Sequence, residues 1–282
     1  MRALTARSGA IGFAVLAAAC ATLPSISASD NPASALGWTT IDAGIEYTAF
    51  AFGEPSSEVF ALKVDLDSVD LVVTPGGPSF GQVIGRSVLG FAREFDCAAA
   101  VNATPFYPDS FRLGEPRFLS GVLVVDGELL SAPAPRFHAL ALSKEGKASI
   151  LSQGALGDTG SLRMAVGGFF SLVKDGKVTG RKTTRTPMTA VGLLEGGRRL
   201  VLVVVDGRRP GSAGMNGEEA GRLLVFLGAV DAMSFDGGGS SAMVIRGADG
   251  RSRMANLPFH LGMPPMERVV GTCIGFRSRG SP

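Results

Sequence analysis

The sequence predicts an α+β protein: a single domain of mixed, hairpin-rich β-sheet with a few packed helices. Of its 282 residues, 45% are hydrophobic, 18% are charged and 39 are glycine. The apolar content supports a sizeable buried core, and the low charge argues against a disordered chain. Short apolar runs alternate with glycine-rich turns, which is typical of strands joined by tight connections rather than of a helical bundle.

The first part of the domain is expected to hold strands and one helix. Apolar runs predict strands at residues 45–52, 59–64 and 69–73, before a Pro-Gly-Gly-Pro turn at 75–78. Five apolar residues then recur at intervals of four and three, which places them on one face of a helix. They are Phe80, Ile84, Val88, Phe91 and Phe95. A short buried strand over 97–101 follows and ends at Asn102.

The middle of the chain is expected to consist mainly of hairpins. Asp-Gly or Gly-Gly pairs between short apolar runs are strong hairpin signals. They occur at 126–127, 175–176 and 196–197, and a Lys-Glu-Gly-Lys turn occurs at 144–147. One strand is expected over 164–173.

A second helix is expected to begin at Asn216. Glu219 follows three residues later, which is close to a capping box. Gly228 lies where a helix C-terminus favours a residue of positive φ. The last strands are expected at residues 230–235, 242–245 and 269–276.

The N-terminus has the pattern of a secretory signal peptide over residues 1–28. Arg2 and Arg7 precede a short apolar run at 11–21, and small residues follow at 27–29. The alternative is a lipoprotein cleaved before Cys20 and anchored through it. Residues 29–42 are rich in Ser, Ala and Pro and are expected to be a linker, with the domain covering 43–278. The expected location is outside the cytoplasm, either periplasmic or secreted.

The charge and hydropathy of the sequence limit the kinds of binding partner that are expected. The formal net charge is +2, and the basic residues form no concentrated patch, so nucleic acid is not expected. No other run reaches the roughly 20 apolar residues of a spanning helix, so membrane association is expected only if Cys20 is lipidated. Cys97 and Cys273 both lie in predicted strands, where either a disulfide or two buried thiols would fit.

The strongest candidate site is the Asp-Gly-Gly-Gly-Ser-Ser segment at 236–241, between two predicted strands. Successive glycines allow the backbone to approach a ligand and can direct several N–H groups at an anion such as phosphate. No Lys follows the glycines and a strand comes next, so this is not a nucleotide-binding P-loop. A tight turn alone would need only one Asp-Gly. The residues expected to bind substrate here are Gly237, Gly238, Gly239, Ser240 and Ser241, beside Asp236.

Two further positions at strand ends can carry chemistry. Asp206 and Arg208 follow the very apolar run 200–205, which would present both charges at a site, although Asp-Gly is also ordinary turn chemistry. Asn102 ends a buried strand and could bind sugar hydroxyls or an acetamido group, or simply end the strand. A Ser-His-Asp triad is not supported, because neither His138 nor His260 has recognisable partners. The absence of a Cys-x-x-C spacing makes a thiolate zinc site improbable, and no metal or cofactor is expected.

Together these segments resemble the phosphodiester glycosidase family. The matching residues run from 203–208 (Val-Val-Val-Asp-Gly-Arg) through 227–232 and 235–241 to 267–270, with weaker matches at 101–106, 121–125 and 165–168. Matched positions add Glu219 and Arg268 to the expected substrate contacts. The sequence departs from the family where Met188 replaces an arginine, so Arg185 or Arg208 would have to bind phosphate. It departs again after Asn102, where Ala-Thr-Pro-Phe replaces Gly-Gly-Phe-Phe.

The resemblance implies hydrolysis of a glycosyl-1-phosphodiester, with a sugar of the N-acetylglucosamine type. Asp236 and Asp206 are the expected catalytic carboxylates, with Asp236 directed at the anomeric carbon or a sugar hydroxyl, and they permit either a retaining or an inverting scheme. The partner is then a carbohydrate or glycolipid phosphodiester. Two alternatives stay open: a non-catalytic protein that binds exopolysaccharide or cell-wall glycan, and a metal-dependent phosphodiesterase that uses both aspartates as ligands.

Overall fold

The computed structural model describes residues 23, 25–26, 36–260 and 266–280. The predicted signal peptide, including Cys20, lies almost entirely outside these residues, as does most of the predicted linker. Within the predicted linker, Thr39–Asp42 (β2) is not a free connection but a strand, which pairs with Ile45–Phe52 (β3). Among the described residues, no helix has the length and apolar character needed to cross a bilayer.

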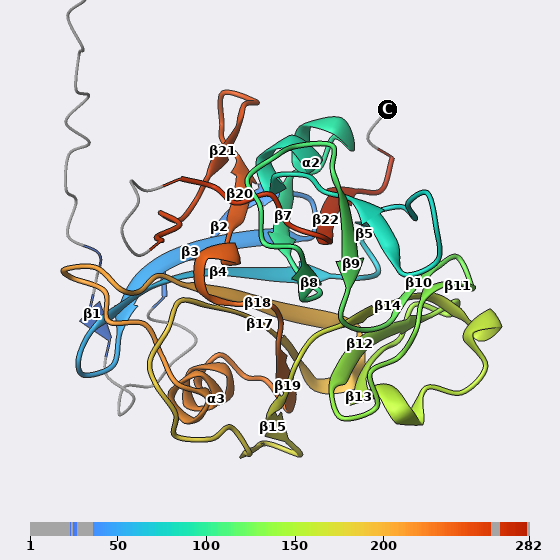
Figure 1. The fold of residues 1–282 in the computed structure, drawn as a ribbon. Helices are drawn as coiled ribbons and strands as arrows, with labels where there is room; N and C mark the ends of the chain where they lie inside the picture. Colours follow the sequence, from blue (N-terminus) through green and yellow to red (C-terminus); the bar gives the residue numbers. More distant parts are fainter. Residues whose placement is uncertain (1–22, 24, 27–35, 261–265, 281–282) are drawn as a thin grey trace, which may run out of the picture.

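The largest sheet has nine strands (Figure 1). Its order is β1-β3-β4-β18-β17-β19-β15-β16, with β2 paired to β3, and only the β1–β3 pair is parallel. The strands are β1 (Ser25–Ile26), β2, β3 (Ile45–Phe52), β4 (Ser57–Asp65), β15 (Ser171–Lys174), β16 (Lys177–Val178), β17 (Met188–Leu193), β18 (Arg199–Val205) and β19 (Asp231–Ser234).

Three smaller antiparallel sheets complete the β-structure. The first has the order β21-β20-β7-β22-β5, from β5 (Val69–Val73), β7 (Ala99–Asn102), β20 (Met243–Arg246), β21 (Ser252–Met254) and β22 (Cys273–Ser278). The second has the order β11-β10-β14-β12-β13, from β10 (Leu123–Val125), β11 (Glu128–Ser131), β12 (His138–Ser143), β13 (Ala148–Ser152) and β14 (Leu162–Gly167). The third joins β6 (Gln82–Ile84), β9 (Pro116–Leu119) and β8 (Phe106–Tyr107).

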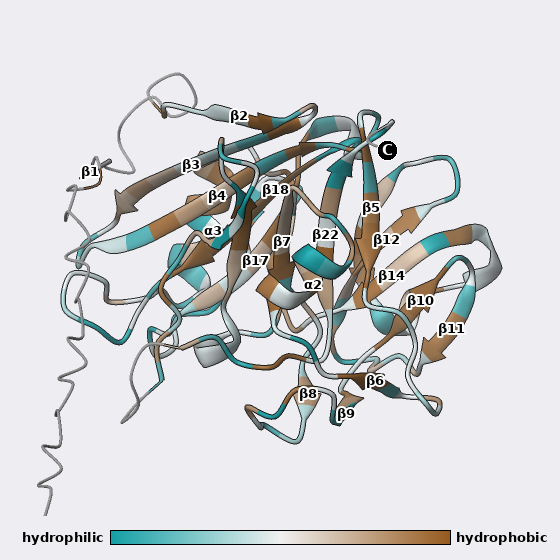
Figure 2. Ribbon diagram, turned by 90° about the horizontal axis from the view of Figure 1, so that it is seen from above, coloured by the Kyte–Doolittle hydropathy of each residue, from teal (hydrophilic) through white to brown (hydrophobic). Residues whose placement is uncertain are grey.

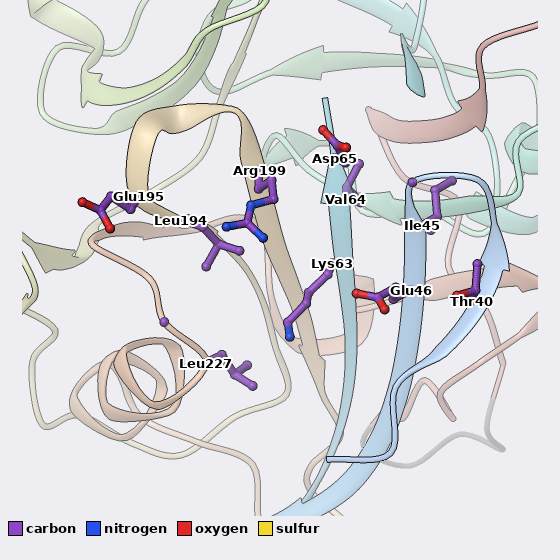
Figure 3. Close-up of a pocket in the computed structure, with 12 residues that line it drawn as sticks. Thr40, Ile45, Glu46, Lys63, Val64, Asp65, Leu194, Glu195, Arg199 and Leu227 are labelled. Carbon is purple, nitrogen blue, oxygen red and sulfur yellow. The ribbon is translucent and has the colours of Figure 1, made fainter. Parts of the chain in front are cut away.

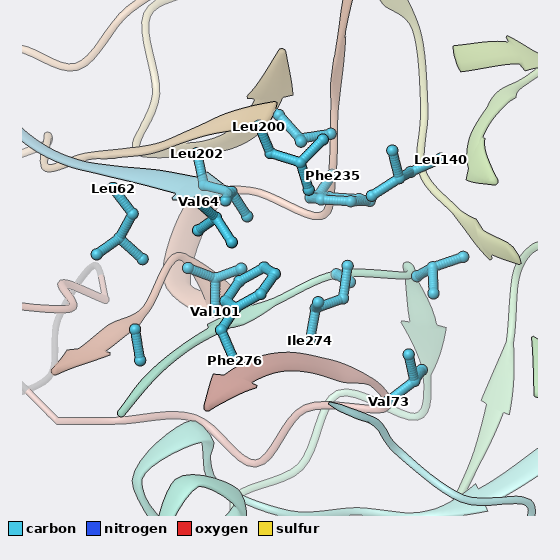
Figure 4. Packing of buried hydrophobic residues seen from close by; sticks show 14 of the residues in the cluster. Leu62, Val64, Val73, Val101, Leu140, Leu200, Leu202, Phe235, Ile274 and Phe276 are labelled. Carbon is cyan, nitrogen blue, oxygen red and sulfur yellow. The ribbon is translucent and has the colours of Figure 1, made fainter. Parts of the chain in front are cut away.

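The main core lies among three sheets: the nine-stranded sheet, the β5–β7–β20–β21–β22 sheet and one face of the sheet formed by β10 to β14 (Figure 4). Alternate residues of β18 explain how this strand can be apolar throughout. Leu200 and Leu202 face the main core, whereas Val201 and Val203 face a second cluster beneath helix α3 (Gly217–Phe226). A strand covered on both faces needs apolar side chains in both directions, since successive residues point to opposite faces. In Figure 2, hydrophobic residues accordingly run along central strands such as β7 and β17.

Two of the three sheets around the main core are each covered on the outer face by one helix. α3 packs against the nine-stranded sheet, and α2 (Val88–Glu94) packs against β7 and β20. Through these two sheets the order of layers is therefore helix, sheet, sheet, helix. The described chain is mostly β with two α-helices, which agrees broadly with the predicted α+β class.

The predicted capping of α3 is confirmed. Asn216 accepts a hydrogen bond from the backbone N–H of Glu219, and the Glu219 carboxylate accepts one from the Asn216 N–H, so the capping box is complete. Gly228 follows the helix at φ +94°. Left-handed φ values at Asp126 and Gly127, 49° and 88°, likewise fit the expected tight turn between β10 and β11.

The predicted helix over Phe80–Phe95 is wrong in its first half. The chain forms β6 at Gln82–Ile84, and α2 begins only after Ser87, whose hydroxyl accepts the Gly90 N–H. Phe80 is 64% exposed and is not part of a buried helical face. The reason is tertiary: β6 pairs with β9, which satisfies backbone groups that a helix would otherwise satisfy internally.

The strand expected over 164–173 is two strands in different sheets. β14 ends at Gly167, and β15 begins at Ser171 in the nine-stranded sheet. Gly168 lies at the crossing, where a Cβ would overlap Met233 and the Ser234 carbonyl. The glycine therefore permits the chain to pass directly beside β19. Cys97 and Cys273, for which a disulfide was one expectation, are buried free thiols.

Candidate active site

The Asp-Gly-Gly-Gly-Ser-Ser loop connects β19 of the nine-stranded sheet with β20 of the adjacent sheet. Two backbone hydrogen bonds hold it in place: Asp236 N to Ala103 O at 2.8 Å, and Gly238 N to Pro187 O at 2.9 Å. Gly238–Ser240 form a single 3-10 turn, with Gly238 at φ +61°. The loop thus spans the ends of two sheets and is fixed to both.

The glycines do not form an open nest of free N–H groups for an anion. Their lack of side chains instead allows neighbouring side chains to approach the loop closely. The amides of Gly238, Ser240 and Ser241 donate to backbone carbonyls, and the Gly237 amide donates to the Asp236 carboxyl group. The expectation that the Gly237–Gly239 amides together bind phosphate is therefore not what the geometry favours. Only Gly239 N has no partner among the described residues.

Three cationic or aromatic side chains use the space that the glycines leave. A Cβ on Gly239 would overlap the His260 ring and lie 3.0 Å from Arg268 Nη2. A Cβ on Gly238 would lie 3.5 Å from both terminal nitrogens of Arg208. Side chains at these positions would push the ring and the guanidinium groups away from the loop.

Asp236 is the acidic centre of this cluster. Burial raises the pKa of its carboxyl group to about 6, despite opposing contributions from the Ser240 hydroxyl, Arg268 and the Gly237 amide, and the Asp109 charge raises it further. A group with this pKa exchanges protons near neutral pH, as a general acid or base must.

Arg268 is held on three sides. Its Nη1 lies 3.5 Å from Ser240 Oγ, its Nη2 lies 3.1 Å from His260 Nδ1, and its Nε lies 3.0 Å from an Asp109 carboxylate oxygen. His260 Nε2 lies 3.0 Å from the Met266 carbonyl, so this nitrogen carries the proton and Nδ1 accepts from Arg268. Burial, followed by the Arg268 charge, lowers the pKa of His260, which agrees with a neutral ring. The guanidinium is thus presented in one orientation.

Sequence reasoning missed His260 and Asp109. His260 was left without a role, and Asp109 lies in the loop after β8, a strand with no special pattern. Phe111 from the same loop packs edge-on against His260, with ring centroids 5.1 Å apart. No local signal marks these residues, because only the fold brings residues 109–111 next to residues 260 and 268.

The Arg208 guanidinium lies beside Gly238 of the glycine loop. The backbone of Arg208 has φ 61°, a left-handed conformation that is uncommon for a residue with a side chain. Such local strain often accompanies a functional position. Arg208 and Arg268 therefore direct two guanidinium groups at the same loop, which suits a phosphate group.

Asn102 does not face a substrate. Its side chain is completely buried and is bonded to the protein: Nδ2 donates to the Asp236 carbonyl at 2.7 Å, and Oδ1 accepts from Thr189 Oγ1 at 2.7 Å and from Ala242 N at 3.1 Å. The Asn102 side chain therefore has a structural role: its hydrogen bonds fix both ends of the loop to β7 and β17. This arrangement does not favour the predicted contact with a sugar.

Asp206 is also buried, at 2% exposure, and its carboxylate is occupied. Oδ1 accepts from Asn256 Nδ2 at 2.8 Å, and Oδ2 accepts from Arg209 Nη2 at 2.9 Å and from Leu257 N at 3.0 Å. Asn256 in turn donates to the Ser241 carbonyl at 3.0 Å. This differs from the expected catalytic role, because Asp206 supports the loop from behind and has no open oxygen for a substrate or a metal.

The remaining predicted residues are Ser240, Ser241, Arg185 and Glu219. Ser240 and Ser241 are both buried, and only Ser240 contacts Asp236. Arg185 forms an ion pair with Glu219, with its Nε 2.9 Å from Oε2, so its charge is already compensated. Across the described residues, no group of three or more His, Cys, Asp or Glu side chains is arranged to hold a metal ion.

A separate pocket of about 540 Å³ lies at another part of the nine-stranded sheet (Figure 3). Lys63 and Arg199 project into it together with acidic side chains such as Glu46. None of the residues predicted for the site lines this pocket. Its mixed charges offer no preference for an anion, so the loop at 236–241 remains the candidate active site.

A comparison with known protein families identifies the family of this chain. The sequence profile of the phosphodiester glycosidase family matches residues 95–277. The chain belongs to the phosphodiester glycosidase family. It is therefore a glycosidase that acts on phosphodiesters, and the matched range contains every candidate site residue. No curated protein sequence matches significantly.

Solved structures share the fold of this phosphodiester glycosidase. The zebrafish N-acetylglucosamine-1-phosphodiester alpha-N-acetylglucosaminidase catalytic domain, described as auto-inhibited by its pro-peptide, aligns at 21% identity and TM-score 0.62, covering 88% of this chain and 87% of that one. A hypothetical Synechocystis protein aligns at 15% identity and TM-score 0.61, covering 84% and 62%. A Burkholderia pseudomallei protein labelled as exported aligns at 18% identity and TM-score 0.55, covering 78% and 74%.

The raised pKa of Asp236 predicts a specific dependence of stability on pH. The folded protein holds this proton up to about pH 6, whereas the unfolded chain releases it near pH 4. The resulting stabilisation is present in full below pH 4 and is lost as the pH rises through 6. The Tm of the wild type minus that of Asp236→Asn, measured by calorimetry, is expected to fall between pH 4 and pH 7. A constant difference would contradict the raised pKa.

Proposed function

We propose that this phosphodiester glycosidase is an exported enzyme that hydrolyses a glycosyl-1-phosphodiester, releasing a sugar of the N-acetylglucosamine type and a phosphate monoester. The observation that carries the proposal is the pairing of a partly buried carboxyl group of pKa about 6, Asp236, with two guanidinium groups at one glycine loop. The zebrafish protein named above, which shares the fold, acts on N-acetylglucosamine-1-phosphodiesters according to its name, which supports the choice of sugar.

Arg268 and Arg208 would bind the phosphate. Both are always charged, and a guanidinium matches phosphate oxygens with two parallel donors. The ion pair of Arg268 with exposed Asp109 would be exchanged for the substrate, while His260 and Ser240 keep the guanidinium in place. His260 and Ser240 hold the Arg268 guanidinium before substrate arrives, so it stabilises the charge of the departing phosphate with little reorganisation of its own.

Asp236 would protonate the oxygen between the anomeric carbon and phosphorus. When protonated, it carries no charge that repels phosphate, and a nearby anion would raise its pKa further. A phosphate monoester has its own second pKa near 6, so proton transfer between the two is nearly balanced. The bond from the anomeric carbon to oxygen breaks, water adds to that carbon, and the water's proton returns through solvent to the Asp236 carboxylate.

Export is supported by the N-terminal sequence and by the fold match to a protein labelled as exported. Intact mass of the protein recovered from its host would test it. A chain beginning near residue 29 is expected, whereas a mass for a lipid-modified chain beginning at Cys20 would favour the lipoprotein alternative.

The test of function is release of N-acetylglucosamine from its synthetic 1-(methyl phosphate), with and without EDTA. Turnover that EDTA leaves unchanged is the expected result. Loss of turnover in EDTA would favour the metal-dependent alternative. Binding of the sugar phosphodiester without release of either product, for every sugar offered, would favour a glycan-binding protein.

Arg268→Met is expected to lower kcat/KM by about 100-fold, because one charged donor to the phosphate is lost. The matched control is Arg251→Met, an exposed arginine in the β20–β21 turn, which should leave kcat/KM unchanged. Added guanidinium ion should partly restore the activity of Arg268→Met. Equal activity of the two variants would contradict the assigned phosphate contact.

A further inference from the structure

Asp109 adds a negative charge to the positive side of the candidate active site. One of its carboxylate oxygens lies 3.0 Å from Arg268 Nε, and its side chain is 58% exposed. The charges of Arg268, Asp109 and Arg208 all act on the pKa of His260, which burial lowers first. Burial raises the pKa of Asp236 most, and the Asp109 charge raises it further. Asp109 and the two arginines therefore act on the same small region.

The loop that carries Asp109 is held from inside the protein by Arg117. This arginine is completely buried, and its Nη2 donates to the backbone carbonyls of Ser110 at 3.2 Å and Arg112 at 2.9 Å. Its Nη1 donates to the Pro116 carbonyl at 3.2 Å. The backbone directly after Asp109 is thus fixed. The exposed carboxylate can turn aside for a ligand, but its charge stays at the site.

The charges beside the phosphate position leave one positive unit. Arg208 and Arg268 contribute two positive charges and Asp109 one negative charge, while Asp236 is uncharged when protonated. A phosphodiester carries one negative charge, which this arrangement balances. A phosphate monoester carries about 1.5 to 2 negative charges at pH 7, because its second pKa is near 6. The site therefore matches the substrate in charge, but not the ionised product.

We propose that Asp109 sets the charge preference of the phosphate position, so that it disfavours dianions and promotes release of the phosphate monoester product. The inference rests on the proposed function, in which Arg208 and Arg268 bind the phosphate. After the bond to the anomeric carbon breaks, the monoester loses its remaining acidic proton to solvent and gains a second negative charge. The Asp109 carboxylate repels that charge and competes with the product for Arg268.

The experiment compares wild type, Asp109→Asn and Asp67→Asn. Asp67 is the matched control, because its side chain is 56% exposed and it pairs with another arginine, Arg198, that is not among the candidate site residues. The probes are sulfate and methyl sulfate, a dianion and a monoanion whose charges do not change near neutral pH. NMR titration at constant ionic strength and about pH 5, below the pKa of Asp236, measures the Kd of each probe.

Asp109→Asn is expected to bind sulfate about ten-fold more tightly than wild type, and methyl sulfate at most about three-fold more tightly. Asp67→Asn should match wild type with both probes. A carboxylate that merely occupies Arg268 would weaken both probes by the same factor, so an equal gain in Asp109→Asn would overturn the proposal. Unchanged Kd values for both probes would overturn it as well.

Inhibition of turnover by methyl phosphate tests the consequence for product release. At about pH 7, where this monoester is mainly a dianion, it should inhibit Asp109→Asn at about ten-fold lower concentration than wild type. The kcat/KM for the phosphodiester should change by no more than about three-fold, because the substrate carries a single charge. Equal inhibition of the two proteins would rule out a role of Asp109 in product release.

The sulfate probes separate this inference from the proposed function. If no sugar phosphodiester is hydrolysed but Asp109→Asn gains affinity for sulfate over methyl sulfate, the function fails and the charge preference set by Asp109 stands. If phosphodiesters are hydrolysed but the relative affinity for the two probes is unchanged in Asp109→Asn, the charge preference fails and the function stands.

Discussion

Asp236→Asn is expected to reduce turnover of a sugar phosphodiester by about a thousand-fold while leaving the protein folded. The amide cannot supply the proton that the bridging oxygen needs, and general acid catalysis contributes about 10²- to 10⁴-fold. Asn is isosteric, and removing a carboxyl group that burial disfavours in its charged form should not lower stability. Single-turnover rates and thermal unfolding of the same preparation measure both effects.

The pH profile distinguishes an acid from a merely structural group. With Asp236 protonated in the active form, wild-type kcat/KM should fall as the pH rises above about 6, and this limb should be absent in Asp236→Asn. Asp126→Asn is the matched control: Asp126 lies in an exposed hairpin turn at φ 49°, which Asn also tolerates. A rate that rises through pH 6 would mean that Asp236 acts in its ionised form.

Asp206→Ala is expected to destabilise the protein by about 3–5 kcal/mol, the usual result of removing one partner of a buried charge pair. Arg209 would lose one of its two carboxylate partners, and Asn256 and Leu257 N would lose their acceptors. Urea unfolding measures the difference in free energy. Activity should fall as well, because Asn256 also supports the loop through the Ser241 carbonyl.

The control for this variant is Asp67→Ala, which removes an exposed ion pair with Arg198. Exposed pairs contribute about 0–1 kcal/mol, so little change in stability is expected. If Asp206→Ala retained the wild-type stability and lost only turnover, Asp206 would be a catalytic residue, as the sequence had led us to expect. If stability and activity were lost in proportion, Asp206 would have a structural role, which is to support the loop.

The sequence predicted the local elements well where one short segment contains all the determinants. The Asn216–Glu219 capping box, Gly228 after the helix and the Asp126-Gly127 turn depend on residues within a few positions of one another. The Asp236 loop was recognisable for the same reason, because its glycines, acid and hydroxyls are consecutive. Local backbone conformations and hydrogen bonds decide such elements, and a single sequence expresses them.

The tertiary structure alone decided which charged groups share the site. Asp206 and Asn102 end apolar strands as an active-site residue would, but both are buried in hydrogen-bond networks behind the loop. Asp109 and His260 have no recognisable pattern, and yet they hold Arg268. A strand end looks the same in sequence whether it faces solvent or protein. Whether the side chain at a strand end points to solvent or into the protein depends on how the sheets pack. That packing is set by contacts between residues far apart in the chain.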